Sequence, residues 1–277
     1  MLIFRKVNDL QSWVRTEKAD GKSIGFVPTM GALHTGHISL ISTSQQDNEI
    51  TVCSIFVNPT QFNDPKDLEK YPRTLEADTI MLADAKCDLL FFPSVEEIYP
   101  PDLKEIEVDL QGLDTMMEGA HRPGHFKGVV QVVHRLLDIV KPDHLYMGQK
   151  DFQQFSIIAH MINELKMPVK LNVCPILRES NMLAQSSRNE RLSPEGRERA
   201  GKIYNTISRA TLLRMKHTPA EVCKILFEEL NHEPFQPEYV EIVDQNNLTS
   251  VNDWNDKCVI CIAVWLEGIR LIDNIIL

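Results

Sequence analysis

The chain has 277 residues, enough for one large domain or for a large and a small one. Its hydrophobic fraction of 43% is that of an ordinary globular protein, and no apolar run is long enough to cross a bilayer. The formal net charge of −10 argues against a nucleic-acid-binding surface, but it leaves room for one locally positive pocket that binds a small anion. Because the N-terminus lacks the features of a signal peptide, we expect a reduced, cytoplasmic protein with neither membrane nor nucleic acid as a partner.

Segments typical of strands and helices alternate through the first two thirds of the chain. Strands are predicted at residues 23–29, 50–58, 88–93, 144–148 and 169–176. Helices are predicted at residues 36–47, 72–86, 128–140 and 150–166, with Pro72 in a first helical turn. Continuous apolar strands that alternate with helices predict an α/β fold with a doubly wound, Rossmann-like parallel sheet, and we assign it to residues 1–175.

The pattern changes near residue 176, where a polar stretch without periodicity, residues 178–196, predicts a loop. One helix is then expected from Pro194 to Met215. A second is expected from Pro219 to Leu230, with Thr218 as its N-cap. Strands are predicted in residues 238–244 and 258–276, with a turn at residues 267–268. We therefore expect a smaller α+β C-terminal domain over residues 176–277.

Cys258 and Cys261 form the one C-x-x-C spacing, which can indicate metal or redox chemistry. Their neighbours are β-branched and aromatic, so the segment is predicted to be a strand. Residues three apart on a strand point to opposite faces, and no second pair completes four ligands. We interpret these cysteines as core residues.

Four polar motifs follow predicted strands of the N-terminal domain: PTMGALHTGH, NPTQF, MGQKDFQQ and, further along the chain, SSRN. In open parallel sheets, ligands bind beyond the carboxyl ends of the strands. Because these motifs are expected at the same edge of one sheet, we predict that they form a single site.

The stretch VPTMGALHTGH combines glycines with two histidines. Gly31 permits a close approach of the backbone at the strand exit. Gly36 and His37 open the next predicted helix, whose unpaired N–H groups and dipole favour an anion. His34 and His37 could then donate to phosphate oxygens, so we favour phosphate binding.

A zinc site and an incidental turn are the alternatives for His34 and His37. Zinc would need a third ligand, and His121 and His125 are the candidates. No H-E-x-x-H motif or carboxylate set accompanies them, which makes zinc the weaker hypothesis.

The stretch PTMGALHTGH resembles the H-x-G-H signature of the nucleotidyltransferase superfamily. Together with NPTQF, YPRT, EGAHRPGHFKGV, GQKDFQQ, SSRN and RLIDN, in this order, the whole chain resembles the pantothenate synthetase (pantoate–β-alanine ligase) family. The resemblance implies ATP-dependent condensation of (R)-pantoate with β-alanine through pantoyl adenylate, with release of AMP and pyrophosphate. It also implies Mg²⁺ as cofactor and a homodimer.

The resemblance also implies the site residues. Pantoate would be bound by Gln61, Gln154, Met30, Asn58 and Arg122. ATP would be bound by Met30, Gly31, His34, Gly36, His37, Gly148, Lys150, Asp151, Ile176, Ser186, Ser187 and Arg188. The catalytic residues would be His34, His37, Lys150 and Arg188. Mg²⁺ would come with ATP rather than through a direct protein ligand. Asp78 is a candidate helper for the ion, but we favour an interpretation in which it faces solvent on its helix.

The residue chemistry fits adenylation independently. Lys150 opens a predicted helix, where it could follow charge that develops on the phosphates, although a solvated surface lysine is the alternative. Gln154 lies four residues later and is expected on the same helical face, whereas Gln153 is expected to be structural. For Asn58, a turn role before Pro59 competes with ligand contact.

The loop of the second superfamily signature departs from its usual pattern. The family commonly has R-E-x-D-G-L-A-M-S-S-R-N, whereas this chain has RESNMLAQSSRN. Asn181 and Met182 replace Asp-Gly, and Gln185 replaces Met, so altered loop dynamics are expected. The rival function is a simple nucleotidylyltransferase with a phosphorylated acceptor. That enzyme would favour Arg and Lys where this chain has Gln61 and Gln154.

Overall fold

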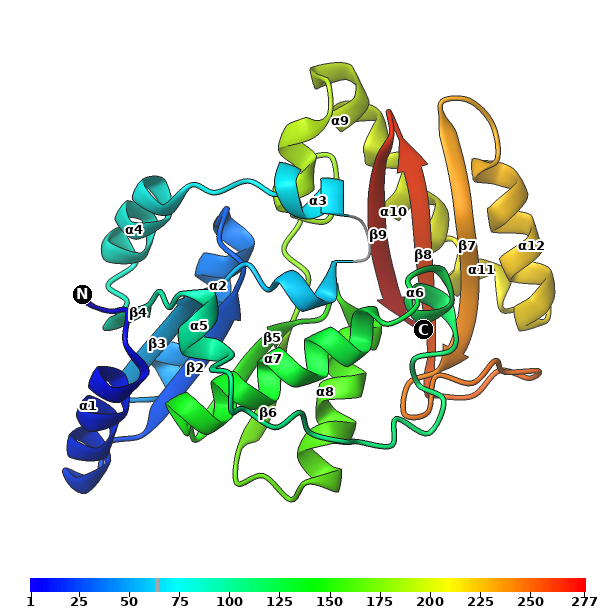
Figure 1. The fold of residues 1–277 in the computed structure, drawn as a ribbon. Coiled ribbons are helices and arrows are strands. Elements are labelled where there is room, and N and C mark those ends of the chain that lie inside the picture. Colours follow the sequence, from blue (N-terminus) through cyan, green and yellow to red (C-terminus); the bar gives the residue numbers. More distant parts are fainter. Residues whose placement is uncertain (63–64) are drawn as a thin grey trace. The chain divides into compact units, whose positions relative to one another are not determined.

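The computed structural model describes residues 1–62 and 65–277. The chain divides into two compact units. The first comprises Met1–Asp114, Gly119–Gly148 and Gln154–Cys174, and the second comprises Thr115–Glu118, Gln149–Gln153 and Pro175–Leu277. The described residues form a six-stranded sheet in the first unit and a three-stranded sheet in the second (Figure 1).

The sheet of the first unit is parallel throughout, as predicted, with the order β1-β4-β3-β2-β5-β6. Its strands are β1 (Leu2–Phe4), β2 (Ile24–Thr29), β3 (Ile50–Ile55), β4 (Leu89–Phe91), β5 (His144–Gly148) and β6 (Lys170–Cys174). Only the edge strand β1 was not expected from the sequence. The chain proceeds outward from β2 in one direction and then starts again at β5 in the other, which makes β2 and β5 the topological switch point.

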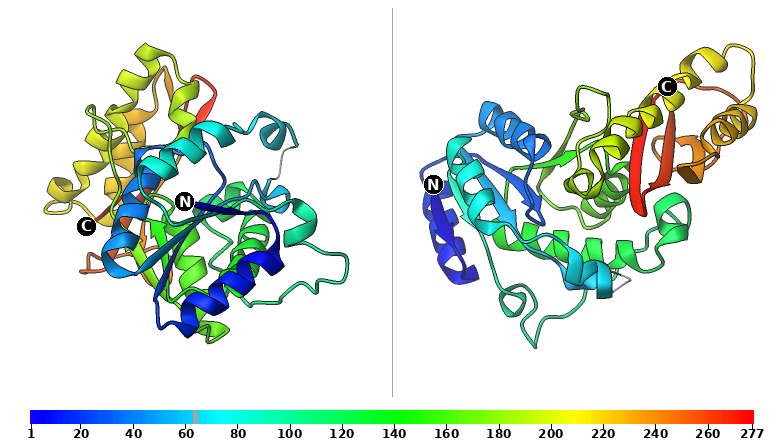
Figure 2. Two further views of the ribbon diagram at one scale, coloured as in Figure 1. Left: turned by 90° about the vertical axis from the view of Figure 1, so that its left-hand side faces the viewer. Right: turned by 90° about the horizontal axis from the view of Figure 1, so that it is seen from above.

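Helices cover both faces of this sheet. The longer ones are α1 (Val7–Ala19), α2 (Thr35–Asp47), α4 (Leu75–Asp84), α7 (His125–Val140) and α8 (Phe152–Glu164). Four shorter helices lie in the connecting segments: η1 (Pro59–Gln61), α3 (Pro65–Lys70), α5 (Val95–Ile98) and α6 (Met117–His121), the last divided between the two units. Leu40 and Ile41 of α2 share a core cluster with Leu82 of α4, and Figure 2 shows α2 and α7 on opposite faces of the sheet.

Three helix starts differ from the prediction by two residues or more, among them that of α7, which begins at His125 instead of Gly128. Helix α4 begins at Leu75 with Thr74 as its N-cap, so Pro72 precedes the helix instead of occupying its first turn. Helix α8 begins at Phe152, because β5 ends at Gly148 and residues 149–150 form a turn. Lys150 therefore lies before the helix, and the expectation that it shares a helical face with Gln154 is wrong.

The second unit contains an antiparallel sheet of order β7-β8-β9 with helices on one face. The strands are β7 (Phe235–Asp244), β8 (Cys258–Leu266) and β9 (Ile269–Ile276). The helices are η2 (Ser187–Arg191), α9 (Pro194–Ala200), α10 (Lys202–Ser208), α11 (Ala210–Leu213) and α12 (Pro219–Leu230). As predicted, Thr218 caps α12, and it forms a reciprocal capping box with Glu221.

The single helix expected from Pro194 to Met215 is divided into α9, α10 and α11. Gly201 lies at the first break, where a Cβ atom would come within 2.1 Å of the Asn181 carbonyl oxygen. A close contact with a segment twenty residues earlier therefore requires glycine there, and helical periodicity alone does not reveal it.

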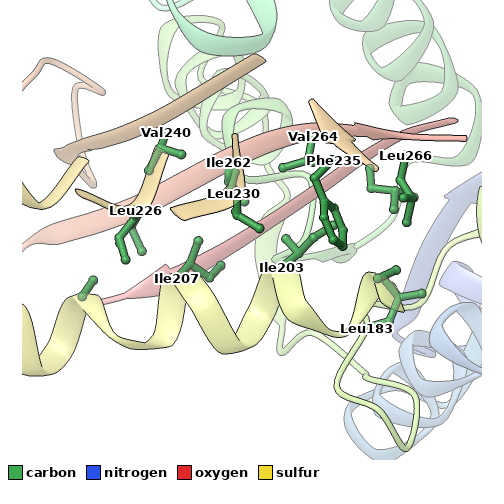
Figure 3. Close-up of a cluster of buried hydrophobic side chains, with 14 of the residues drawn as sticks. Leu183, Ile203, Ile207, Leu226, Leu230, Phe235, Val240, Ile262, Val264 and Leu266 are labelled. Carbon is green, nitrogen blue, oxygen red and sulfur yellow. The ribbon is translucent and has the colours of Figure 1, made fainter. Parts of the chain in front are cut away.

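Alternation along β8 separates the two faces of the small sheet. Ile260, Ile262, Val264 and Leu266 pack with Ile203 and Ile207 of α10 and with Leu226 and Leu230 of α12 (Figure 3). Cys258 belongs to this cluster, whereas the buried Cys261 does not, so the two cysteines lie on opposite faces as predicted. Both thiols are free.

No helix within the described part of the chain has the length and apolar character needed to span a membrane.

Candidate functional site

The two histidines after β2 cap the helix that they begin. His34 is the N-cap of α2, and its Nδ1 accepts the Gly36 N–H at 3.1 Å. His37 Nδ1 accepts the His34 N–H at 3.3 Å, and the two ring centroids lie 4.1 Å apart. Since both Nδ1 atoms act as acceptors, each neutral ring carries its proton on Nε2. Donation from Nε2 is the property that the phosphate hypothesis requires of the two rings.

Asp78 of α4 holds the turn that leads to these histidines. Its Oδ2 accepts the Ala32 N–H at 2.9 Å, and its Oδ1 accepts the Leu33 N–H at 2.8 Å and the Thr74 hydroxyl at 3.1 Å. Ala32 has a φ of 50°, and Gly31 has one of 83°. Asp78 is only 2% exposed, so the expectation that it faces solvent is wrong. The carboxylate is buried because it satisfies the N–H groups of this left-handed turn.

Gln61 of η1 is oriented by a chain of side-chain hydrogen bonds. Its Oε1 accepts from Asn58 Nδ2 at 3.1 Å, which turns its Nε2 towards the Met30 sulfur at 3.2 Å. Asn58 is fixed in turn, because its Oδ1 accepts the Tyr99 hydroxyl at 2.9 Å and its Nδ2 also donates to the Gly128 carbonyl at 3.2 Å. Asn58 also caps η1, so the turn role expected for it is present. Tyr99, Thr60 and the Gly128 carbonyl together orient Asn58, which in turn determines which end of the Gln61 amide donates.

Arg122, Gln154 and Gly148 are the other residues of the first unit that are expected at the site. Arg122 and Gln154 are both half-buried, and Gly148 ends β5 with open space where a Cβ would be. His125 is buried, and its Nδ1 pairs with the Gln61 carbonyl at 2.8 Å, so it supports the segment that carries Gln61.

Gln153 belongs to the second unit. It is buried there, and its Nε2 donates to the Met116 carbonyl at 2.9 Å, in keeping with the structural role expected for it.

In the second unit, Lys150 and Asp151 lie on a turn that is fixed by strand β9. Asn274 Nδ2 donates to the carbonyls of Gln149 and Lys150, each at 3.0 Å, and Asn274 Oδ1 accepts from Gln149 Nε2 at 3.0 Å. The Lys150 ammonium lies 3.5 Å from an Asp151 carboxylate oxygen. The main chain at the lysine is therefore set by a residue 124 positions away.

Residues 177–185 form a short hairpin that leads to Ser186, Ser187 and Arg188. Arg178 bridges to Ala184, and its guanidinium forms two hydrogen bonds with Asp273 at 2.7 and 2.9 Å. Burial raises the pKa of the Asp273 carboxyl, and the charges of Arg178 and Lys150 oppose that shift. The half-buried Ile176 precedes the hairpin.

Two of the three departures from the usual loop pattern, Asn181 and Met182, have a structural consequence. Met182 adopts a φ of 74°, a left-handed conformation that glycine takes without strain. Asn181 Nδ2 donates to the carbonyls of Arg197 at 2.7 Å and Glu198 at 3.2 Å, near the end of α9. Ser186 begins η2 and accepts the Arg188 N–H at 3.3 Å. Asn181 thus ties the hairpin to α9, whereas Met182 occupies a conformation that glycine would take without strain.

The described residues favour neither the zinc alternative nor thiol chemistry. No cluster of three or more His, Cys, Asp or Glu side chains suited to a metal ion occurs within residues 1–62 and 65–277. Burial raises the pKa of the Cys87 thiol to about 12 and that of Cys223 to about 11, so these thiols stay protonated near neutral pH.

Sequence reasoning missed several residues that support the expected site. Tyr99 carried no sequence signal of this role. Asp78 was considered only as a magnesium helper or a solvated residue. Asp273 and Asn274 fall within RLIDN, one of the motifs of the family resemblance, which had no assigned role.

The comparisons with known proteins agree with each other. The pantoate-beta-alanine ligase family matches residues 2–276. The pantothenate synthetase of Porphyromonas gingivalis is 51% identical over 99% of both chains, and that of Bacteroides thetaiotaomicron is 48% identical over 99% of this chain and 98% of its own.

Solved structures give the same result. Pantothenate synthetase from Thermus thermophilus superposes with a TM-score of 0.92 at 38% identity, covering 100% of this chain and 99% of the other. The pantoate-beta-alanine ligase of Francisella tularensis, complexed with beta-gamma ATP and beta-alanine, has a TM-score of 0.83 at 37% identity and covers 100% and 97% of the two chains. With motifs, fold and full-length matches in agreement, the chain belongs to the pantoate–β-alanine ligase family.

Proposed function

We propose that the chain condenses (R)-pantoate with β-alanine to give pantothenate, while ATP is cleaved to AMP and pyrophosphate through pantoyl adenylate. Family membership supports the overall reaction. The observation that carries the substrate assignment is the Gln61 carboxamide, which Asn58 holds with its Nε2 directed at Met30. An uncharged donor orients the pantoate carboxylate or hydroxyl without the full ion pairing that would suppress nucleophilicity.

In the first step, a pantoate carboxylate oxygen attacks the α-phosphorus of ATP, and the bond to the bridging oxygen of pyrophosphate breaks. Gln61, Gln154, Met30, Asn58 and Arg122 are assigned to pantoate. The negative charge that moves to pyrophosphate is stabilised by His34 and His37 through their Nε2–H groups and by Lys150 and Arg188. Gly31, Gly36, Gly148, Asp151, Ile176, Ser186 and Ser187 complete the proposed ATP site.

In the second step, the β-alanine amine attacks the carbonyl carbon of pantoyl adenylate. The bond between that carbon and the phosphate oxygen breaks, AMP leaves, and the nitrogen loses a proton. Since the acyl phosphate is already activated, this step depends less on Lys150 than adenylation does. We therefore assign Lys150 mainly to the first step.

Magnesium is part of the proposal, as an ion that enters with the triphosphate and neutralises part of its charge. Asp78 does not fit the role of direct ligand, because its oxygens already accept two backbone N–H groups and the Thr74 hydroxyl. No step is assigned to the ion.

A homodimer, which rests on the family resemblance, and a cytoplasmic location complete the proposal. Light scattering coupled to size-exclusion chromatography measures the first directly. A mass near twice 31.7 kDa is expected, and the monomer mass would contradict it.

The test of function is substrate-dependent AMP release. The purified chain with ATP should release AMP steadily only when pantoate and β-alanine are both present, with one pantothenate formed for each AMP. AMP release that needs neither substrate, or pyrophosphate release driven by a phosphorylated acceptor alone, would support the simple nucleotidylyltransferase instead.

A further inference from the structure

Two adjacent residues near the end of the chain contact both segments of the second unit that are assigned to ATP. Asp273 and Asn274 belong to β9 and are buried, with 4% and 2% of their surfaces exposed. Adjacent strand residues point to opposite faces of a sheet. Asp273 is paired in register with Ile262, on the face that α10 and α12 cover, and Asn274 is paired with Cys261, on the other face.

On its face, Asn274 uses its whole carboxamide to hold one turn. Three hydrogen bonds of 3.0 Å join it to the Gln149 side chain and to the carbonyls of Gln149 and Lys150. Two carbonyls that point at one amide group fix the peptide planes on both sides of the Lys150 Cα atom. The starting direction of the lysine side chain is set by this contact.

On the opposite face, Asp273 holds the base of the hairpin. Its two oxygens pair with both terminal nitrogens of Arg178, the geometry that gives a carboxylate–guanidinium pair its directionality. Arg178 also donates to the Met182 carbonyl at 3.1 Å, and its guanidinium lies 4.0 Å over the Tyr204 ring of α10. The hairpin is thereby fastened to the sheet eight residues before Ser186.

We propose that Asp273 and Asn274 are positioning residues of the ligase, Asn274 for Lys150 and Asp273 for the hairpin that leads to Ser186, Ser187 and Arg188. Neither needs to touch a substrate. Because the two residues are neighbours on strand β9, they fix the turn at Lys150 and the hairpin before Ser186 relative to each other. The inference rests on the proposed function, since it takes Lys150 and Arg188 to act on ATP.

The Asn274→Ala enzyme tests the first half of the proposal. We expect its single-turnover rate of pantoyl-adenylate formation to fall about 10- to 100-fold, because misplacing a catalytic group by about 1 Å has an effect of that size. The pantoate dissociation constant should not change. Supplied with preformed pantoyl adenylate and β-alanine, the variant should make pantothenate at the normal rate. A normal adenylation rate, or an equal loss in both half-reactions, would overturn the role of Asn274.

The Asp273→Asn enzyme tests the second half. It keeps the shape of the side chain but loses the ionic pairing with Arg178. Trypsin should cleave the native variant after Arg178, Arg188 and Arg191 faster than it cleaves the parent, and the KM for ATP should rise while that for pantoate stays constant. Unchanged trypsin sensitivity together with an unchanged KM for ATP would contradict the role of Asp273.

A matched control separates positioning from stability. Leu226 of α12 is fully buried in the core cluster of the same unit, on the face of the sheet opposite to Asn274. Leu226→Ala should lower the melting temperature at least as much as Asn274→Ala does, yet retain the adenylation rate. If the control loses adenylation to the same extent, the effect of Asn274→Ala is one of stability and the positioning role is refuted.

The Lys150→Ala enzyme distinguishes failure of this inference from failure of the proposed function. Should it form adenylate normally, the assignment of Lys150 is wrong. If Lys150→Ala does not form adenylate while Asn274→Ala forms it at the normal rate, the positioning role of Asn274 is refuted and the proposed function stands. When both lose activity, the double variant should be no slower than Lys150→Ala alone, since Asn274 acts through Lys150. An additive further loss would contradict that route.

Discussion

The two units support their site residues in different ways. In the first unit part of the support lies close in sequence to what it holds, since His34 and His37 cap their own helix and Asn58 orients Gln61 three residues later, while Asp78 and Tyr99 add support from more distant positions. In the second unit, Lys150 is held by Asn274, which is 124 positions away. Local supports leave a motif that can be recognised in the sequence. A distant support is a single residue without a local pattern that shows what it holds, so its role becomes evident only in the folded structure.

The largest expected effect is in the second unit, at Lys150. Lys150→Ala should reduce the single-turnover rate of pantoyl-adenylate formation by about 100- to 1,000-fold, the usual loss when one group that stabilises developing charge is removed. Rapid-quench measurement of the adenylate gives this rate. The control is Lys170→Ala, at an exposed lysine of β6 in the first unit, which should behave like the parent. An unchanged rate in Lys150→Ala would place the essential positive charge elsewhere.

Next in size is the loss of the turn support in the first unit. Asp78→Asn keeps the size of the side chain but replaces one carboxylate oxygen with an amide NH₂. The backbone N–H group that this oxygen accepts in the parent then has no acceptor. We expect the free energy of unfolding to fall by about 1–3 kcal/mol, the cost of leaving a buried donor unpaired, with a parallel loss of adenylation. Urea denaturation measures the first quantity. Asp84→Asn, at the exposed end of the same helix, should change neither, and a stable, active Asp78→Asn enzyme would refute the role given to the turn.

A smaller effect is expected at Tyr99, which supports Gln61 indirectly. Tyr99→Phe removes the hydroxyl that donates to Asn58, a loss of about 1 kcal/mol, so the KM for pantoate should rise about fivefold. The KM for ATP should stay constant, as initial-rate kinetics can establish. Tyr204→Phe, which keeps the ring under Arg178, is the control. A rise in both KM values would indicate a general disturbance instead of an oriented amide.

The smallest effect is a gain in stability. Met182→Gly relieves a left-handed residue in the hairpin, and we expect the free energy of unfolding to increase by up to about 1 kcal/mol. Met215→Gly, at an exposed position that is not left-handed, should instead lower it by about 0.5–1 kcal/mol. If Met182→Gly is the less stable of the two, strain at Met182 is not significant.

The sequence predicted most elements correctly where local chemistry determines them. Thr218 and Pro219 mark a helix start through capping, and Glu267 and Gly268 mark a hairpin turn. In the structure both turn residues have a positive φ, of 52° and 71°. The strands of the large sheet were recognised because they are apolar throughout. These signals depend on neighbours in the chain.

The predictions failed where a distant contact decides the outcome. The helix expected from Pro194 breaks at Gly201, where the close approach of the Asn181 carbonyl leaves no room for a Cβ atom. Asp78 looked like a solvated helix residue, yet it is buried against Ala32 and Leu33. Of the site, the residue types and motifs were readable, whereas the hydrogen bonds that orient them depend on the fold.

The central claim, that pantoate is activated as an acyl adenylate, is tested most directly with pantoate labelled with ¹⁸O in both carboxylate oxygens. One labelled oxygen attacks the α-phosphorus and stays there when the β-alanine amine displaces AMP. Mass spectrometry should therefore find one ¹⁸O atom in each AMP and one in the new amide. AMP without label, or label in inorganic phosphate beside ADP, would contradict the adenylate mechanism.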